Sequence, residues 1–167
     1  MARQPAQYLP KPPDMFDRDW EWSELTAFAT GEGVGPRLGV VSGRRRQGKS
    51  FLLQALAEAT GGFYFAAAEA SEAESLHMLG EAIADYTGTA APHRPARWDE
   101  ALELVIGLAA ERPVTIVIDE FPYLVRSSPV LPSQLQETIG MGRGRYLERH
   151  PPARWLRVDL LRVMARL

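Results

Sequence analysis

The sequence predicts an α/β fold of three layers, in which helices cover both faces of a parallel β-sheet. Three short apolar runs have the length of buried strands, and segments with apolar residues at helical spacing alternate with them. This alternation is typical of layered folds with a parallel sheet. The 167 residues suffice for one domain, and an apolar fraction of 46% beside a charged fraction of 24% is that of a soluble globular protein.

The first predicted strand, residues 38–42, leads into a loop rich in glycine and arginine. Residues 43–50 read Gly-Arg-Arg-Arg-Gln-Gly-Lys-Ser and fit the pattern G-x-x-x-x-G-K-[ST]. Such a loop curls its backbone N–H groups around phosphate oxygens, and the following helix adds its positive N-terminal end. Coincidence is the weaker alternative, because Lys11 and Lys49 are the only two lysines of the chain. The motif predicts a nucleotide phosphate site and a P-loop NTPase-type sandwich.

Each position of this motif has an expected role. Lys49 is expected to reach the outer phosphates, and the Ser50 hydroxyl to ligate Mg²⁺. The residues expected to bind the nucleotide are Gly43, Arg44, Arg45, Arg46, Gln47, Gly48, Lys49, Ser50 and Phe51.

Alternating helices and strands follow the loop. A helix over residues 51–60 is expected to stop at Gly61-Gly62, and residues 63–66 form the second strand. Ser71 and Glu74 have capping-box spacing and begin a helix that ends near residues 87–88, with Leu76, Leu79, Ile83 and Tyr86 on one face. Another amphipathic helix is expected over residues 98–110, before Arg112-Pro113.

Residues 114–120 are a β-branched run that ends in two carboxylates. Such a run predicts a central strand buried on both faces, and ligands of parallel sheets bind beyond the carboxyl ends of the strands. Asp119 is expected to hold Mg²⁺ opposite Ser50, directly or through a water, while Glu120 polarises a water for attack on the terminal phosphate. Catalysis is therefore assigned to Glu120 and Lys49, and metal binding to Ser50 and Asp119. Residues 121–124 are expected to pack at the edge of the sheet.

The N-terminal part divides into an arm and a helix. Residues 1–13 contain four prolines and no periodicity, which predicts a disordered or extended arm. Residues 14–28 have helical spacing, with Trp20, Ser23 or Glu24, and Ala27 or Phe28 on one face. One interpretation is an amphipathic helix packed on the edge of the sheet.

Composition excludes several classes of protein. The chain has no cysteine, so thiol catalysis, disulfides and cysteine-ligated metals are excluded, and its three histidines lack metal-ligand spacing. No signal peptide or membrane-spanning stretch is recognised, so the cytoplasm is the expected location and no membrane partner is expected. Residues 1–140 hold 12 Lys and Arg against 19 Asp and Glu, whereas residues 141–167 hold 7 Arg against 2 acids.

Three stretches together resemble a known family. They are Phe16-x-Arg18 with Glu21 and Leu25, the 43–50 loop, and residues 116–124, Ile-Val-Ile-Asp-Glu-Phe-Pro-Tyr-Leu. This combination resembles the archaeal-type ATPases, in the AAA-like and STAND-like branch of the P-loop NTPases, over about residues 14–136. The resemblance implies Mg²⁺-dependent ATP binding, hydrolysis through Glu120, and a place near the adenine for Phe16 and Arg18. Family members are thought to act as regulatory ATPases or switches.

After residue 136 the chain departs from the family pattern. Members continue into another core strand that ends in a polar sensor residue and lies between the loop strand and the Asp119 strand, and this strand cannot be recognised here. The expectation is a partial core over residues 14–136, an atypical Arg-rich segment over residues 137–167, and a chain truncated or frame-shifted after about residue 136, with an incomplete sandwich. Two alternatives stay open. Residues 155–160 fill the gap as a strand, although their charges suit a central strand poorly, or residues 156–167 form an amphipathic helix.

Three functions are therefore compatible with the sequence. The favoured one is ATP binding with Mg²⁺-dependent hydrolysis to ADP by a regulatory ATPase core, acting with a homo-oligomer or protein partner. The second is a nucleotide-binding regulatory or interaction module, or a truncated remnant, without effective hydrolysis. It draws on the unrecognised sensor strand and on the lack of an arginine finger beyond Arg143 or Arg145. The third is nucleic-acid binding by the Arg-rich segment, against which a solvated tail is the simpler account.

Overall fold

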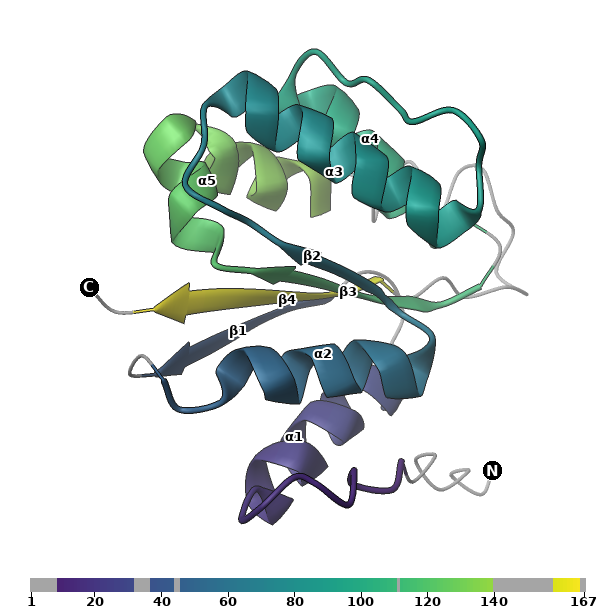
Figure 1. Ribbon diagram of the computed structural model, residues 1–167, viewed down its shortest axis with the longest axis vertical. Helices are drawn as coiled ribbons and strands as arrows, with labels where there is room; N and C mark the ends of the chain where they lie inside the picture. Colours follow the sequence, from purple (N-terminus) through teal and green to yellow (C-terminus); the bar gives the residue numbers. More distant parts are fainter. Residues whose placement is uncertain (1–8, 32–36, 44–45, 111, 140–157, 166–167) are drawn as a thin grey trace.

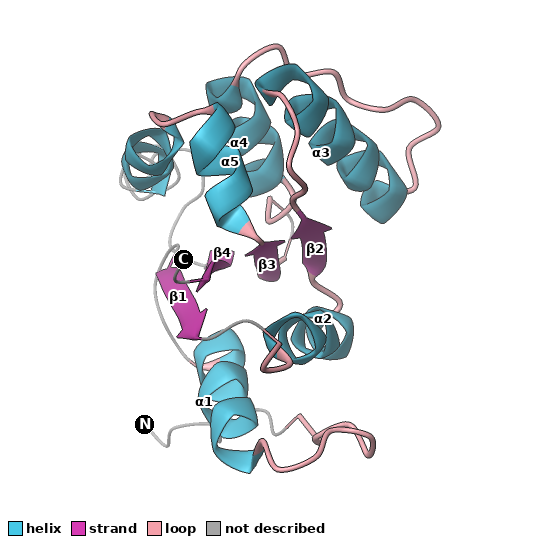
Figure 2. Cartoon of the chain, turned by 60° about the vertical axis from the view of Figure 1, so that its left-hand side comes forward, coloured by secondary structure: helices cyan, strands magenta, loops and turns pink. Residues whose placement is uncertain are grey.

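A parallel β-sheet lies between two layers of helices (Figures 1 and 2). The computed structural model describes residues 9–31, 37–43, 46–110, 112–139 and 158–165. Within these residues the sheet has four strands in the order β1-β4-β3-β2, and every neighbouring pair is parallel. The strands are β1 (Arg37–Gly43), β2 (Phe63–Ala66), β3 (Val114–Asp119) and β4 (Val158–Ala165). The prediction of a three-layer α/β sandwich with a parallel sheet is confirmed.

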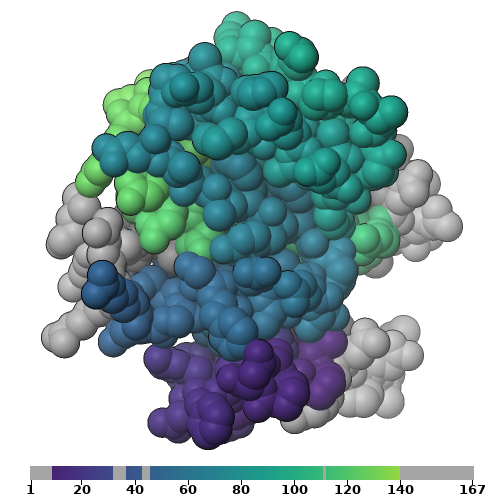
Figure 3. Space-filling model, in the orientation of Figure 1, coloured from purple at the N-terminus to yellow at the C-terminus, as the bar shows by residue number. Residues whose placement is uncertain are grey.

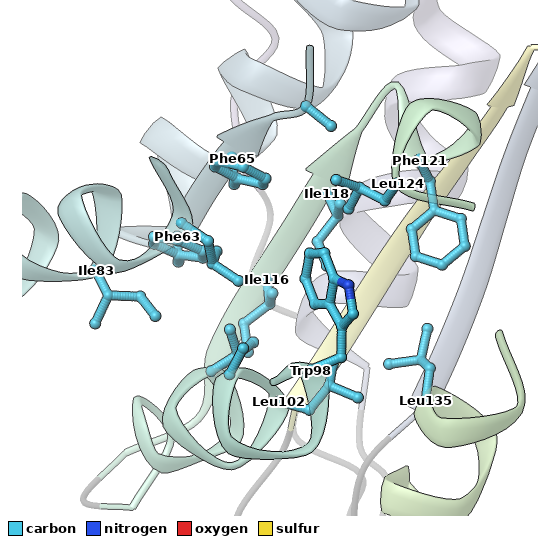
Figure 4. Close-up of a cluster of buried hydrophobic side chains, with 14 of the residues drawn as sticks. Phe63, Phe65, Ile83, Trp98, Leu102, Ile116, Ile118, Phe121, Leu124 and Leu135 are labelled. Carbon is cyan, nitrogen blue, oxygen red and sulfur yellow. The ribbon is translucent and has the colours of Figure 1, made fainter. Parts of the chain in front are cut away.

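One face of the sheet is covered by α3 (Glu72–Thr87), α4 (Trp98–Gly107), α5 (Phe121–Ser127) and a further helix over residues 131–139. Between these helices and the sheet lies the larger hydrophobic cluster, which we call the upper core (Figure 4). Phe63, Ile83, Ile116 and Leu135 meet there from four different elements, each at most 2% exposed. Burial of this apolar surface is the main force that holds the upper layer on the sheet.

The other face is covered by α2 (Lys49–Thr60), which packs on β3, and α1 (Asp19–Thr30) packs in turn on α2. In the space-filling view the colour of α1 lies directly below that of α2 (Figure 3). A second cluster, the lower core, joins α1, α2 and the sheet through Trp22, Leu53, Leu56 and Val117. Val117 belongs to this cluster and its neighbours Ile116 and Ile118 belong to the upper core, as the alternation of side chains along a strand requires.

Most of the predicted elements are confirmed. The second strand has the predicted bounds, and every residue of β3 is buried, as expected for a central strand. The capping box of α3 is present, because the Glu74 N–H donates to Ser71 Oγ at 3.3 Å and the Ser71 N–H donates to Glu74 Oε2 at 2.9 Å. At the end of α2 the N–H groups of Gly61 and Gly62 donate to the carbonyls of Glu58 and Ala57.

The predicted buried face of α1 is wrong at Trp20, whereas its Phe28 does pack against the lower core. Trp20 is 72% exposed, whereas Trp22, Leu25 and Thr26 are buried against α2 and the residues before α1. The Trp22 Nε1–H donates to the carbonyl oxygen of Leu9 at 2.9 Å, which fixes the end of the arm on the helix. The helix packs on α2, and its Phe28 also contacts the edge strand β1, where the Arg37 guanidinium lies 4.6 Å from the centre of the Phe28 ring. Residues 1–8 of the predicted arm lie outside the described residues.

The expectation for residues 121–124 is also wrong. They begin α5, and Phe121 and Leu124, each 1% exposed, lie in the upper core and not at an edge of the sheet (Figure 4). Pro122 in the first turn suits a helix start, because the N–H groups of the first turn have no partner within the helix and the lack of one costs nothing.

The strand β4 fills the gap between β1 and β3. Its register places Asp159 beside Arg37 on one side and beside Thr115 on the other. The strand alternative for the C-terminal segment is thus confirmed, with bounds of residues 158–165, and the helix alternative is wrong. The reason is that β1 and β3 both have backbone groups that need partners, and this requirement outweighs the local pattern. Residues 140–157, with Arg143 and Arg145, lie outside the described residues.

Candidate functional site

The loop that follows β1 joins the strand to the first turn of α2. Among its described residues, 46–48, two are left-handed: Arg46 at φ 60° and Gly48 at φ 73°. Alternation with left-handed residues turns successive backbone N–H groups toward one side, which is how such loops form anion-binding concavities. A Cβ on Gly48 would meet no atom within 4 Å, so glycine is needed there for its backbone conformation and not for space.

The residues expected to contact the nucleotide lie around this turn. Lys49 begins α2 and is half-buried, Ser50 is exposed in the same turn, and Phe51 is 45% exposed. Gly43 is the last residue of β1, and Arg46, Gln47 and Gly48 connect it to the helix; Arg44 and Arg45 lie outside the described residues. An anion at this helix start would meet the backbone N–H groups of the first turn and the positive end of the helix dipole.

The start of α1 adjoins the loop. The Arg18 guanidinium donates from Nη2 to the carbonyl oxygen of Gln47 at 3.0 Å, and its Nη1 lies 2.5 Å from Glu21 Oε1. The hydrogen bond with Arg18 helps to hold the pKa of the Glu21 carboxyl below its usual range, after the larger effect of a backbone hydrogen bond. Phe16, two residues earlier, is 89% exposed. The sequence pointed to this segment only through the family resemblance, and it did not predict the contact between Arg18 and the loop.

The second part of the site is the turn between β3 and α5, formed by Asp119 and Glu120. Asp119 is 2% exposed, and its Oδ1 accepts a hydrogen bond of 2.8 Å from the Glu120 N–H. Glu120 is the N-cap residue of α5 and has a left-handed backbone at φ 53°. A non-glycine residue in this region is strained, and residues of this kind cluster at functional sites.

Both parts lie at the same edge and the same face of the sheet. The carboxyl ends of β1 and β3 meet at one edge, where the loop after β1 and the start of α5 are found (Figure 1). Asp119 lies two residues after Val117 in β3, so both side chains are on the same face of the sheet, and Val117 belongs to the lower core between the sheet and α2. Its carboxylate therefore belongs to the face that α2 covers, and α2 begins with Lys49 and Ser50. Residues that are seventy positions apart in the sequence share one edge of the fold.

Tyr64 is a site residue that sequence reasoning missed. It lies in β2 opposite Val117, and its hydroxyl donates to Asp119 Oδ2 at 2.8 Å. Burial raises the pKa of Tyr64 well above its usual value, and the hydrogen bond to the Asp119 carboxylate raises it further. Only the register between β2 and β3 brings the two residues together, so no pattern in the sequence could have identified the pair.

The donor set fits a magnesium ion. Asp119 and Ser50 offer a carboxylate and a hydroxyl, the hard oxygen ligands that Mg²⁺ prefers. Within the described part of the chain, no group of three or more His, Cys, Asp or Glu residues is placed to hold a metal. Two protein oxygens complemented by phosphate and water are the arrangement typical of nucleotide-bound Mg²⁺, which seldom has an all-protein cage.

Comparisons with known proteins extend the description of the fold. No protein-family model matches the chain, and no curated protein matches it in sequence. No helix in the described ranges is both long and apolar enough to cross a membrane. Among solved structures, the chain is similar to the ORC2 protein of Aeropyrum pernix, described as ADPNP-ADP complexes, with a TM-score of 0.58 and 21% identity. The similarity covers 95% of this chain and 43% of that chain, so this chain spans less than half the length of the neighbour. It shows that the sandwich recurs in a solved structure.

Proposed function

We propose that this chain binds ATP together with Mg²⁺ and hydrolyses it to ADP and phosphate, as a regulatory ATPase core. One observation carries the proposal. The loop residues 46–48 before α2, two of them left-handed, lie at the same edge of the parallel sheet as the buried Asp119 and Glu120. This edge is where ligands of such sheets bind. The solved neighbour is described in complexes with ADPNP and ADP, which supports a nucleotide as the ligand.

Each residue has a distinct task in this proposal. The N–H groups of the loop and Lys49 bind the phosphates, and Ser50 and Asp119 would hold Mg²⁺, which neutralises charge on the phosphate oxygens. Glu120 accepts a proton from a water whose oxygen attacks the terminal phosphorus. The bond from that phosphorus to the bridging oxygen breaks, and its electron pair stays on ADP. The core is assigned to residues 14–136, to which β4 adds a central strand.

A thermal melt with and without Mg-ATP tests the binding step. Ligand at about a hundred times its dissociation constant adds about 2.7 kcal/mol to the unfolding free energy of a protein that binds it only when folded. We expect this shift in the wild type and its loss in Lys49→Ala. Lys11→Ala is the matched control, because Lys11 is the only other lysine of the chain. It lies before α1, and its ammonium pairs with Asp19 at the start of that helix, at 2.6 Å. No shift in the wild type, or equal shifts in both lysine variants, would contradict the proposal.

Release of phosphate separates an ATPase from a nucleotide-binding module. A melt that shifts with Mg-ATP, together with steady phosphate release, supports turnover. A shift without phosphate release would leave binding in place and assign the site to a regulatory module without hydrolysis.

A further inference from the structure

Among the described residues, the hydroxyl of Tyr64 is one of two hydrogen-bond donors that hold the Asp119 carboxylate from different directions. Its bond to Oδ2 is 2.8 Å long, and the Glu120 N–H bonds Oδ1 at the same distance. The second donor is the next residue in the chain, whereas Tyr64 comes from another strand, 55 positions away. The Ala67 N–H adds a 3.0 Å bond to the carbonyl oxygen of Asp119, which ties the end of β2 to the backbone of the same residue.

Tyr64 itself is held firmly. Its ring packs against the lower core, and its backbone lies in the β2–β3 ladder opposite Val117. An anchored ring places its hydroxyl with little freedom, because a tyrosine side chain has only two rotatable bonds before the ring. The carboxylate of Asp119 therefore meets a donor whose position is set by the sheet.

We propose that Tyr64 is a positioning residue for the divalent cation: its hydroxyl fixes the Asp119 carboxylate in the orientation that receives Mg²⁺ beside the nucleotide. This inference rests on the proposed function of the same site. With one donor on each oxygen, Asp119 keeps a further acceptor position on each oxygen for the cation or for a water that the cation carries. Without the tyrosine hydroxyl, Oδ2 loses its donor and the carboxylate can turn about its side-chain bonds.

Loss of such a supporting hydrogen bond typically lowers metal affinity by about 10–100-fold. We therefore expect Tyr64→Phe to raise the Mg²⁺ concentration at half-maximal binding of a non-hydrolysable ATP analogue by about that factor. Affinity for the analogue in EDTA should stay the same, because Lys49 and the loop do not depend on the tyrosine. A merely structural role of Tyr64 would change both affinities and the melting temperature together.

Tyr86→Phe is the matched control. Its hydroxyl also makes a 2.8 Å bond, to the carbonyl of Gly61 just before β2 and away from Asp119, and its ring contacts Phe63 edge-on. Removing this hydroxyl should leave the Mg²⁺ midpoint at the wild-type value. The double variant Tyr64→Phe with Asp119→Asn gives a further check. Once the charged carboxylate is gone, Tyr64→Phe should cause no additional loss of Mg²⁺ affinity.

The outcomes separate the inference from the proposed function. A Mg²⁺ midpoint in Tyr64→Phe equal to those of the wild type and Tyr86→Phe would overturn the inference and leave the function intact. An equal loss of affinity in EDTA would also overturn it, because the residue would then support the fold and not the cation. If the wild type itself shows no Mg²⁺-dependent binding, the proposed function fails and the inference fails with it.

Discussion

The two parts of the candidate site are built in different ways. The 43–50 loop consists of neighbouring residues, and its described part before α2 is shaped by the left-handed backbone of Arg46 and Gly48. The turn of Asp119 and Glu120 depends on residues from two strands, because Tyr64 of β2 holds the carboxylate that ends β3. A local motif therefore predicts the first part well, and tertiary structure completes the second.

The largest expected effect concerns catalysis at the acidic turn. Glu120→Gln should lower the rate of phosphate release by about 10²–10⁴-fold, because an amide cannot accept the proton of the attacking water. Binding of Mg-ATP should remain, since the loop is untouched. Phosphate release and the thermal shift are measured side by side, with Glu137→Gln, on the exposed side of the 131–139 helix, as control. Turnover unaffected by Glu120→Gln would refute the assigned role.

A change just before β2 tests how closely β2 must pair with β3, the strand that ends at the acidic turn. A Cβ on Gly62 would lie 2.4 Å from the carbonyl oxygen of Thr115, so Gly62→Ala must push β2 away from β3. We expect the unfolding free energy to fall by about 1–3 kcal/mol in urea titrations. Gly107→Ala is the control, since a Cβ there meets nothing within 4 Å. Equal stabilities of the two variants would mean that the strands separate at no cost.

A smaller loss is expected in the loop. Gly48→Ala places a side chain on a backbone at φ 73°, which costs about 1–2 kcal/mol for a residue other than glycine. No atom lies within 4 Å of the added Cβ, so the loss comes from the backbone alone. Urea unfolding without ligand measures it, and a stability equal to that of the wild type would show that the loop relaxes to another conformation.

The smallest effect has the opposite sign. Glu120→Gly removes a side chain from a left-handed position at φ 53° and should raise the unfolding free energy by about 0.5–1 kcal/mol, although it abolishes turnover. A gain in stability with loss of activity would show that strain at Glu120 is kept for function. If the variant is less stable than the wild type, the glutamate side chain contributes contacts that outweigh the strain.

Sequence patterns predicted the elements whose own residues determine them. The 63–66 strand, the buried run of β3 and the capped start of α3 follow from apolar spacing and from Ser71 with Glu74. The face of α1 was predicted wrongly, because Trp20 and Trp22 are both compatible with an apolar stripe and only the packing on α2 selects Trp22. Residues 121–124 were expected at the edge of the sheet. They begin α5, and Phe121 and Leu124 are buried in the upper core.

The sequence by itself determined the layered α/β class and the candidate loop, because apolar periodicity and the glycine and lysine positions act over a few neighbouring residues. Only the tertiary structure decided that β4 lies between β1 and β3 and that Tyr64 meets Asp119. Both depend on strand pairing between segments far apart in the chain. The physical reason is that backbone groups of a central strand must be paired from both sides, whatever the local composition of the segment that pairs with them.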